Sequence, residues 1–253
     1  MLLRAENLSK RFGGVAAVQA VELAVESGTV HSIIGPNGAG KTTLLNLLCG
    51  IYEPDAGKIV FGEEDVTGYP PHEFASAGIG RTFQNLQIFF NMSVLENVMA
   101  GGWLHEACGL AAALLRPPGL ARAERRARTE AGELLTFVGL ERWAGSPSDG
   151  LPYGALKRLE IARALAARPK LLLLDEPAAG LNPTETREID QLIRRIAERG
   201  ITVVLVEHNM KLVMEVSQRV LVLDHGRKLA EGEPAAVSQD PQVIEAYLGV
   251  EAC

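Results

Sequence analysis

Residues 35–43 read GPNGAGKTT, and this stretch limits the possible folds of the chain more than any other. It matches the phosphate-binding pattern G-x-x-x-x-G-K-[ST]. The apolar run Val30–Ile34 before it predicts a buried strand, and the leucine-rich run Leu44–Leu48 after it predicts the buried face of a helix. A strand that enters such a loop and a helix that leaves it are the context that the pattern requires. We therefore expect an α/β fold in which helices flank a mostly parallel sheet.

The residue types of this loop suit the binding of a polyphosphate. Glycines let backbone N–H groups approach the phosphates, and the helix that begins at Lys41 turns its positive dipole end toward them. The Lys41 ammonium supplies a charge for the β- and γ-phosphates, and the Thr42 hydroxyl is a ligand for Mg²⁺. The alternative is a glycine-rich turn that binds nothing. The predicted nucleotide contacts are Gly35, Pro36, Asn37, Gly38, Ala39, Gly40, Lys41, Thr42 and Thr43.

A second informative feature is a pair of acidic residues that follows four leucines. Leu171–Leu174 predict a parallel strand buried on both faces, and Asp175 and Glu176 stand at its carboxyl end. We expect Asp175 to hold Mg²⁺ and Glu176 to accept a proton from a water that attacks the γ-phosphate. The alternative is a turn that is acidic by coincidence.

Three further residues are weaker candidates. His208 follows the apolar run 201–206 and is expected at the same sheet edge as Asp175, although a lone histidine is more often structural. Gln84 stands between apolar residues, where a surface amide is the ordinary explanation. Phe12 is either a platform for a base or an aromatic residue at the end of a strand. Val18 is grouped with Phe12 as a nucleotide contact.

Composition excludes several classes of protein. The 253 residues carry a net charge of −6, which gives no indication of nucleic-acid binding. Three scattered cysteines fit a reducing cytoplasm better than a disulfide framework. The first ten residues lack the apolar core of a signal peptide, and no apolar run approaches the ~20 residues of a membrane helix.

The rest of the chain predicts one domain, 1–253, with subdomains. Residues 2–8, 21–25 and 57–61 are expected to form an antiparallel layer, and residues 219–223 and 227–230 a late hairpin. The predicted helices are 94–100, 109–115, 121–138, 156–167 and 241–248. We expect residues 1–84 and 156–253 to form the nucleotide-binding core, and residues 85–155 to form an inserted helical subdomain.

Taken together and in this order, these segments resemble the ATP-binding subunit of an ABC transporter. The resemblance identifies the loop as Walker A, Gln84 as the Q-loop glutamine and His208 as the switch histidine. It also assigns Leu151–Ala155 as the signature, 171–176 as Walker B and Ala179–Asn182 as the D-loop.

A closer resemblance is to the larger ATPase subunit of the high-affinity branched-chain amino acid uptake system. The segments that carry it are GRTFQN (80–85), MSVLENV (92–98), EPAAGLNP (176–183), VEHNM (206–210) and AYLG (246–249). One departure concerns the signature, in which Pro152, Tyr153 and Ala155 differ from L-S-G-G-Q. In the family the signature closes on the γ-phosphate of the partner subunit. Gly154 is therefore the expected contact to the partner's nucleotide, and two equally active sites are in doubt.

The resemblance implies ATP and Mg²⁺ as ligands, with Gln84 sensing the metal. It also implies a homo- or heterodimer with a second ATPase subunit, two integral-membrane permeases, and indirectly a periplasmic solute-binding protein. The chain would lie in the cytoplasm, peripheral on the inner face of the membrane, with no nucleic-acid partner. The segment Asn85–Asn97 would dock the permeases, unless its apolar residues are core.

Other functions stay open at this point. They are an ATPase for urea or amide uptake, one for lipopolysaccharide export, a soluble ABC protein outside transport, and a nucleotide-binding regulator without catalysis. The intact Glu176, Gln84 and His208 argue against the last of these.

Overall fold

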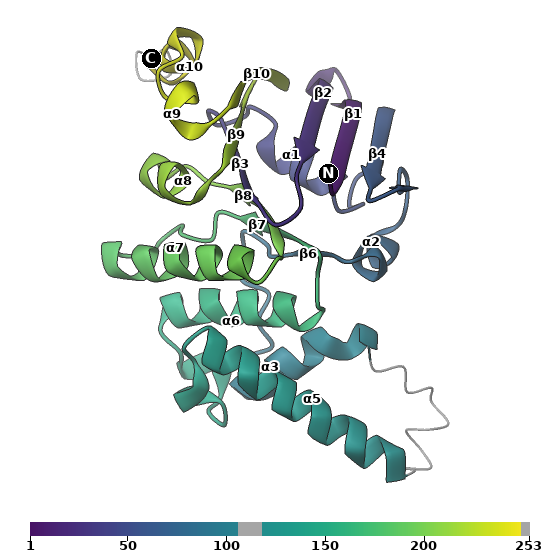
Figure 1. Cartoon of the computed structure of the whole chain (residues 1–253), viewed down its shortest axis with the longest axis vertical. Helices are drawn as coiled ribbons and strands as arrows, with labels where there is room; N and C mark the ends of the chain where they lie inside the picture. Colours follow the sequence, from purple (N-terminus) through teal and green to yellow (C-terminus); the bar gives the residue numbers. More distant parts are fainter. Residues whose placement is uncertain (106–117, 249–253) are drawn as a thin grey trace. The chain divides into compact units, whose positions relative to one another are not determined.

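The computed structural model describes residues 1–105 and 118–248, which form two compact units (Figure 1). One unit consists of Met1–Arg81 and Lys170–Cys253, and the other of Thr82–Pro169. The sequence analysis assigns residues 156–169 to the nucleotide-binding core, whereas in the structure they lie in the helical unit. The helix Tyr153–Ala166 packs against the other helices of that unit.

The first unit contains all the named strands. They are β1 (Leu3–Phe12), β2 (Val15–Val25), β3 (Val30–Ile34), β4 (Ala56–Phe61), β5 (Glu64–Asp65), β6 (Ile79–Arg81), β7 (Leu171–Asp175), β8 (Thr202–Val206), β9 (Arg219–Asp224) and β10 (Arg227–Gly232). An antiparallel sheet has the order β2-β1-β4-β5, and a six-stranded sheet has the order β10-β9-β3-β8-β7-β6. In the second sheet only β10 runs antiparallel to its neighbour. The expected fold class is confirmed.

The central strands of the larger sheet, β3, β7 and β8, are short, mostly apolar segments. Every residue of β3, β7 and β8 is buried, as expected for strands covered on both faces. One face packs with α1 (Lys41–Leu47) and the antiparallel sheet around a shared hydrophobic core. A smaller core on the other side includes Ile34, Val213 and Val222.

The other helices of this unit are α2 (Pro71–Ala77), α7 (Pro183–Glu198), α8 (Met210–Val216), α9 (Pro234–Val237) and α10 (Pro241–Leu248). The predicted helices include α10 but not α2, α7, α8 or α9. For α7 the local signals are nevertheless strong. Asn182 caps the helix in a capping box with Glu185, and Pro183 occupies its first turn. The buried residues Ile189, Ile193 and Ile196 then follow at helical spacing.

The first two strands are longer than predicted. Strand β1 extends to Phe12 and β2 begins at Val15, so Phe12 ends a strand and pairs with Val15 across a two-residue turn. Their pairing shifts register, and Asn7 and Ala20 adopt left-handed backbone conformations. These irregularities interrupt the alternation of apolar and polar residues from which strand ends were predicted.

The helical unit contains α3 (Val94–Gly101), α5 (Pro118–Phe137) and α6 (Tyr153–Ala166), which pack against one another (Figure 1). Its short 3₁₀ segments are η1 (Gly102–His105), η2 (Glu141–Trp143) and η3 (Ser148–Gly150). The predicted helix 109–115 lies outside the described residues. Among the helices that the structure describes, none combines the length and apolar character needed to cross a membrane.

Candidate nucleotide site

The glycines of the loop between β3 and α1 are required by its tight surroundings. Gly35 and Gly40 have φ angles of 148° and 99°. A Cβ on Gly35 would lie 2.1 Å from the carbonyl oxygen of Leu223, and one on Gly40 would lie 2.3 Å from that of Ala17. The backbone of β9 and β2 therefore braces the loop, and no larger residue fits without displacing it.

The outward side of the same loop is open. Gly38 has a φ angle of 81°, and a Cβ built on it meets nothing within 4 Å. Asn37 and Thr42 are exposed, whereas Ala39 is buried and can offer a ligand only its backbone. The loop thus forms a concave strip of backbone with space beside it, as phosphate binding requires.

Lys41 connects the loop to the acidic strand end. Its Nζ donates hydrogen bonds of 2.7 and 2.9 Å to the carbonyl oxygens of Gly35 and Pro36. Burial lowers the pKa of Lys41, while the carboxylates of Glu176 and Asp175 act in the opposite direction. The fold therefore brings the predicted lysine and both predicted acids within electrostatic range of one another.

Asp175 is buried at the end of β7 and has a cationic partner that the sequence analysis missed. Arg81 Nη2 lies 3.0 Å from Asp175 Oδ2. The other terminal nitrogen of Arg81 contacts the Asn46 side chain on α1 and lies 3.0 Å from Cys49 Sγ. Strand β6, which ends at Arg81, is the neighbour of β7 in the sheet. Arg81 thus ties the acid to the helix that follows the loop.

Glu176 and His208 meet directly, as their predicted positions at neighbouring strand ends required. His208 Nε2 lies 2.9 Å from Glu176 Oε1, and the two side chains are 43% and 16% exposed. The backbone N–H of Glu176 donates to the Val206 carbonyl at 2.9 Å, and its φ angle of 49° turns the chain sharply. A carboxylate in this position is accessible and oriented, as a proton acceptor must be.

The residues available for Mg²⁺ are hard oxygen donors. Thr42 in the first turn of α1 offers a hydroxyl and Asp175 a carboxylate. Mg²⁺ commonly binds through one or two such groups together with substrate phosphates and water. The donor set therefore fits this metal. Within the described part of the chain, no group of three or more His, Cys, Asp and Glu side chains is arranged to hold a metal ion.

The two candidates for base contact differ. Phe12 is exposed at the tip of β1, and its ring packs edge-on against Tyr52 with centroids 5.1 Å apart. Val18 is fully buried in the hydrophobic core, so its side chain has no exposed surface to present to a base. Contact of either residue with a base stays a prediction.

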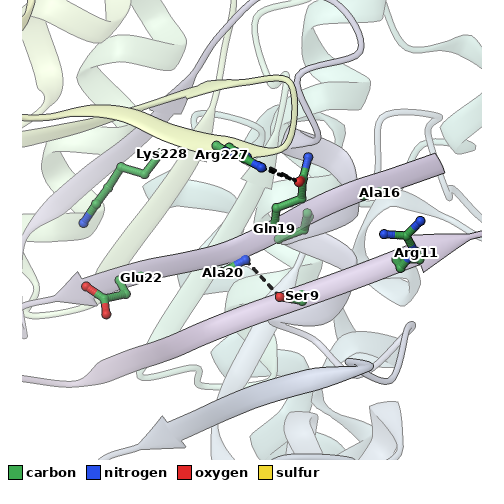
Figure 2. Close-up of a pocket in the computed structure, with 9 residues that line it drawn as sticks. Ser9, Arg11, Ala16, Gln19, Ala20, Glu22, Arg227 and Lys228 are labelled. Atoms are coloured by element: carbon green, nitrogen blue, oxygen red, sulfur yellow. Dashed lines mark hydrogen bonds between the residues drawn. The ribbon is translucent and has the colours of Figure 1, made fainter.

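A cavity of about 750 Å³ is lined by residues of β1, β2 and β10. Figure 2 shows their side chains. Arg227 there donates to the Gln19 side chain, and the Ala20 N–H donates to Ser9. The described residues that line it include Val18 but not the phosphate loop or the acidic strand ends. The phosphate-loop motif, which is the strongest in the sequence, therefore does not line this cavity. Its lining residues are Ser9, Arg11, Ala16, Val18, Gln19, Ala20, Glu22, Arg227 and Lys228.

Gln84 and Gly154 belong to the helical unit, and their predicted roles stay predictions. Gln84 is exposed, and its carbonyl oxygen accepts a hydrogen bond of 3.4 Å from Lys157 Nζ on α6. The neighbouring Phe83 N–H donates to Glu160, also on α6. Gly154 is the second residue of that helix and is buried in the single chain.

Comparison with known proteins gives two family matches. Residues 18–179 match the family described as ABC transporter. Residues 227–253 match the family described as branched-chain amino acid ATP-binding cassette transporter. The chain is also 44% identical over 249 residues to the high-affinity branched-chain amino acid transport ATP-binding protein BraF of Pseudomonas aeruginosa. That alignment covers 98% of each sequence.

Two solved structures support the same comparison. The ADP conformation of MJ1267, an ATP-binding cassette of an ABC transporter, is 34% identical with a TM-score of 0.85 and 98% coverage of both chains. A dimeric post-hydrolysis state of the ATP-binding cassette MJ0796, bound to ADP and Pi, is 26% identical with a TM-score of 0.78. That match covers 92% of this chain and 99% of the other.

Proposed function

The chain belongs to the ABC transporter ATPase family, and from that premise we propose that it energises the uptake of branched-chain amino acids. The family makes it an ATPase. The observation that carries the catalytic part of the proposal is the Glu176–His208 pair beside the phosphate loop.

In the proposed reaction the chain's own residues divide the work. The loop 35–43 binds the phosphates through its backbone, and Lys41 exchanges its loop carbonyl contacts for phosphate oxygens. Glu176 accepts the proton of the attacking water, and His208 holds the γ-phosphate after leaving the carboxylate. The accessible, oriented Glu176 side chain supports this assignment.

Thr42 and Asp175 are the proposed metal ligands, and Gln84 the residue that senses the metal. When held by these residues, Mg²⁺ would supply positive charge to the phosphates. Arg81 keeps Asp175 in one orientation through a buried ion pair. The helix that starts at Tyr153 would present Gly154 to the nucleotide of a second ATPase subunit. The similarity to the dimeric cassette MJ0796 supports the pairing of two such subunits.

Membrane permeases are the proposed partners of the helical unit. Phe89 and Phe90 are 45% and 51% exposed, whereas Ile88 between them and the predicted Q-loop is buried. Asn97 fixes the Phe89 backbone, accepting from its N–H at 2.9 Å and donating to its carbonyl at 3.0 Å. Two aromatic rings on a fixed backbone are suited to partner contact. The chain would then lie on the inner face of the membrane, with a periplasmic binding protein delivering the solute.

The test of this proposal is reconstitution with its two permeases and the second ATPase subunit in proteoliposomes. We expect ATP-dependent uptake of radiolabelled leucine, isoleucine or valine. Phe89→Ser and Phe90→Ser should each lower uptake, while the ATPase of the free subunit persists, because the exposed rings contribute little to its core.

Ile244→Ser is the matched control, since Ile244 is another exposed apolar residue and lies on α10. Its uptake should equal that of the wild type. A joint loss of uptake and free ATPase in Phe89→Ser would make this residue part of the core. Absence of branched-chain amino acid uptake by the wild-type complex would refute the solute assignment and leave the ATPase assignment standing.

A further inference from the structure

Glu207 lies between the two catalytic loops and has no role in the function described so far. It directly follows β8 and precedes His208, and its side chain is buried. An acidic side chain in such a place is costly unless hydrogen bonds satisfy it. Its partners therefore indicate what it does.

Among the described residues, the hydrogen-bond partners of the Glu207 carboxylate are backbone N–H groups from two different loops. Oε1 accepts from the Ala178 N–H at 2.8 Å. Oε2 accepts from the N–H groups of His208 and Asn209 at 3.1 and 3.3 Å. Burial raises the pKa of Glu207, and these three N–H groups counteract that effect.

Through Ala178, the Glu207 carboxylate connects the loop after β7 to the loop after β8. Strands β7 and β8 are paired as far as Asp175 and Val206, and the Glu176 N–H still donates to the Val206 carbonyl. The pairing of the two strands ends at this point. The Glu207 carboxylate continues the connection, because it joins the residue two positions after Glu176 to the backbone of His208.

The same bridge extends toward the next helix. The Ala178 carbonyl accepts from the Leu181 N–H at 3.2 Å, and Asn182 then caps α7. The segment from Glu176 to Asn182 is thus fixed at one end by the sheet, at the other by the helix cap, and in its middle by Glu207.

We infer that Glu207 is a positioning residue that sets the distance between Glu176 and His208 by clamping their two loops together. This inference rests on the proposed role of Glu176 in ATP hydrolysis. Glu207 acts through backbone and touches no reacting group, so its loss should impair turnover far more than ATP binding.

The decisive variant is Glu207→Gln, which keeps the side-chain shape but replaces one acceptor oxygen with an NH₂ donor that faces an N–H group. We expect the kcat for ATP hydrolysis to fall on the order of 10–100-fold, as for other supporting residues. The KM for ATP should change by less than about threefold. Glu207→Asp keeps the charge but cannot span both loops, and it should lose kcat in the same way.

Asp190→Asn is the matched control. Asp190 is another buried carboxyl group in the same unit, and burial raises its pKa too. It lies on α7, and the hydrogen bonds among the described residues include none from its side chain to either loop. If the loss in Glu207→Gln came from removing a buried charge, Asp190→Asn would lose kcat equally, and that result would overturn the inference.

A double variant separates this inference from the proposed function. In a Glu176→Gln background, Glu207→Gln should cause little further loss of kcat, because it acts through the residue already removed. A full multiplicative loss would overturn the clamp. Wild-type kcat in Glu207→Gln would overturn it as well, even with Glu176→Gln inactive. An active Glu176→Gln enzyme would instead refute the proposed function itself.

Discussion

Strands β7 and β8 lie side by side and end in the same pattern, a buried carboxylate followed by an accessible functional group. Strand β7 delivers Asp175 and then Glu176, and Glu207 and then His208 follow β8. The accessible members meet each other at 2.9 Å. The buried members differ in how their charge is compensated.

Asp175 is compensated by a side chain, and Glu207 by backbone. The guanidinium of Arg81 lies 3.0 Å from one oxygen of Asp175, whereas Glu207 accepts from three N–H groups. An arginine pair keeps a carboxylate ionised and leaves it able to share its charge with a metal. A carboxylate enclosed by backbone N–H groups instead holds those segments in place. The role of an acidic residue at a strand end therefore depends on its hydrogen-bond or ion-pair partners. Its position alone does not determine that role.

Replacing each acid by its amide should separate the metal-binding role of Asp175 from the positioning role of Glu207, and the larger effect is expected at Asp175. Asp175→Asn should lower ATPase activity on the order of 10³-fold, because it removes the proposed charged ligand of Mg²⁺. The Mg²⁺ concentration for half-maximal activity should rise. Glu207→Gln should keep the wild-type Mg²⁺ requirement. Titration of ATPase activity with Mg²⁺ measures both, and equal shifts in the two variants would abolish the distinction.

Asp175→Asn also leaves Arg81 without its charged partner, so loss of stability must be separated from loss of chemistry. Breaking a buried pair typically costs about 3–5 kcal/mol, whereas replacing both members is often tolerated. The double variant Arg81→Leu/Asp175→Asn should therefore unfold closer to the wild type than Asp175→Asn does. Its ATPase should remain as low. Recovery of activity with stability would show that Asp175 has only a structural role.

A third buried ionisable group, His31 in the same sheet, extends the comparison, and its expected effect on stability is smaller. His31 in β3 is buried, and burial lowers its pKa to about 4, against the opposing charge of Glu231. Arg219 and Lys228 lower it further. His31 therefore remains neutral at pH 7.

The folded-state pKa of His31 lies below the ordinary 6.5, so the unfolded chain binds its proton first as pH falls. Its stabilising contribution is complete above pH 6.5 and is lost between about pH 6.5 and pH 4. The loss amounts to about 3 kcal/mol. Urea unfolding of the wild type and His31→Gln across this range should show a shallower pH dependence in the variant. Identical slopes would mean that His31 accepts a proton without cost.

The parts of this site that could be predicted from sequence are those with local causes. The loop 35–43 and the buried strands that end at Asp175 and Val206 depend on glycine spacing and continuous apolar runs. The pairing of β1 with β2 shifts register, which disturbs the alternating pattern from which their ends are predicted. Helix α7 is absent from the prediction although Asn182 and Glu185 form a capping box at its start.

The compensation of buried charge had no local signal. Arg81 and Asp175 are 94 positions apart, and Ala178 and Glu207 are 29 positions apart. Only the strand order β8-β7-β6 brings these pairs together. Such partners require the fold, because nothing in the type or spacing of the residues identifies them.

The central claim is that Glu176 accepts the proton of the attacking water, and Glu176→Gln tests it most directly. The amide preserves the shape and the ATP contacts but cannot act as the base. Turnover should fall on the order of 10²–10⁴-fold, while isothermal titration shows that MgATP still binds. The variant should also accumulate as an ATP-bound dimer in size-exclusion chromatography. Near-normal steady-state ATPase activity in Glu176→Gln would contradict the account.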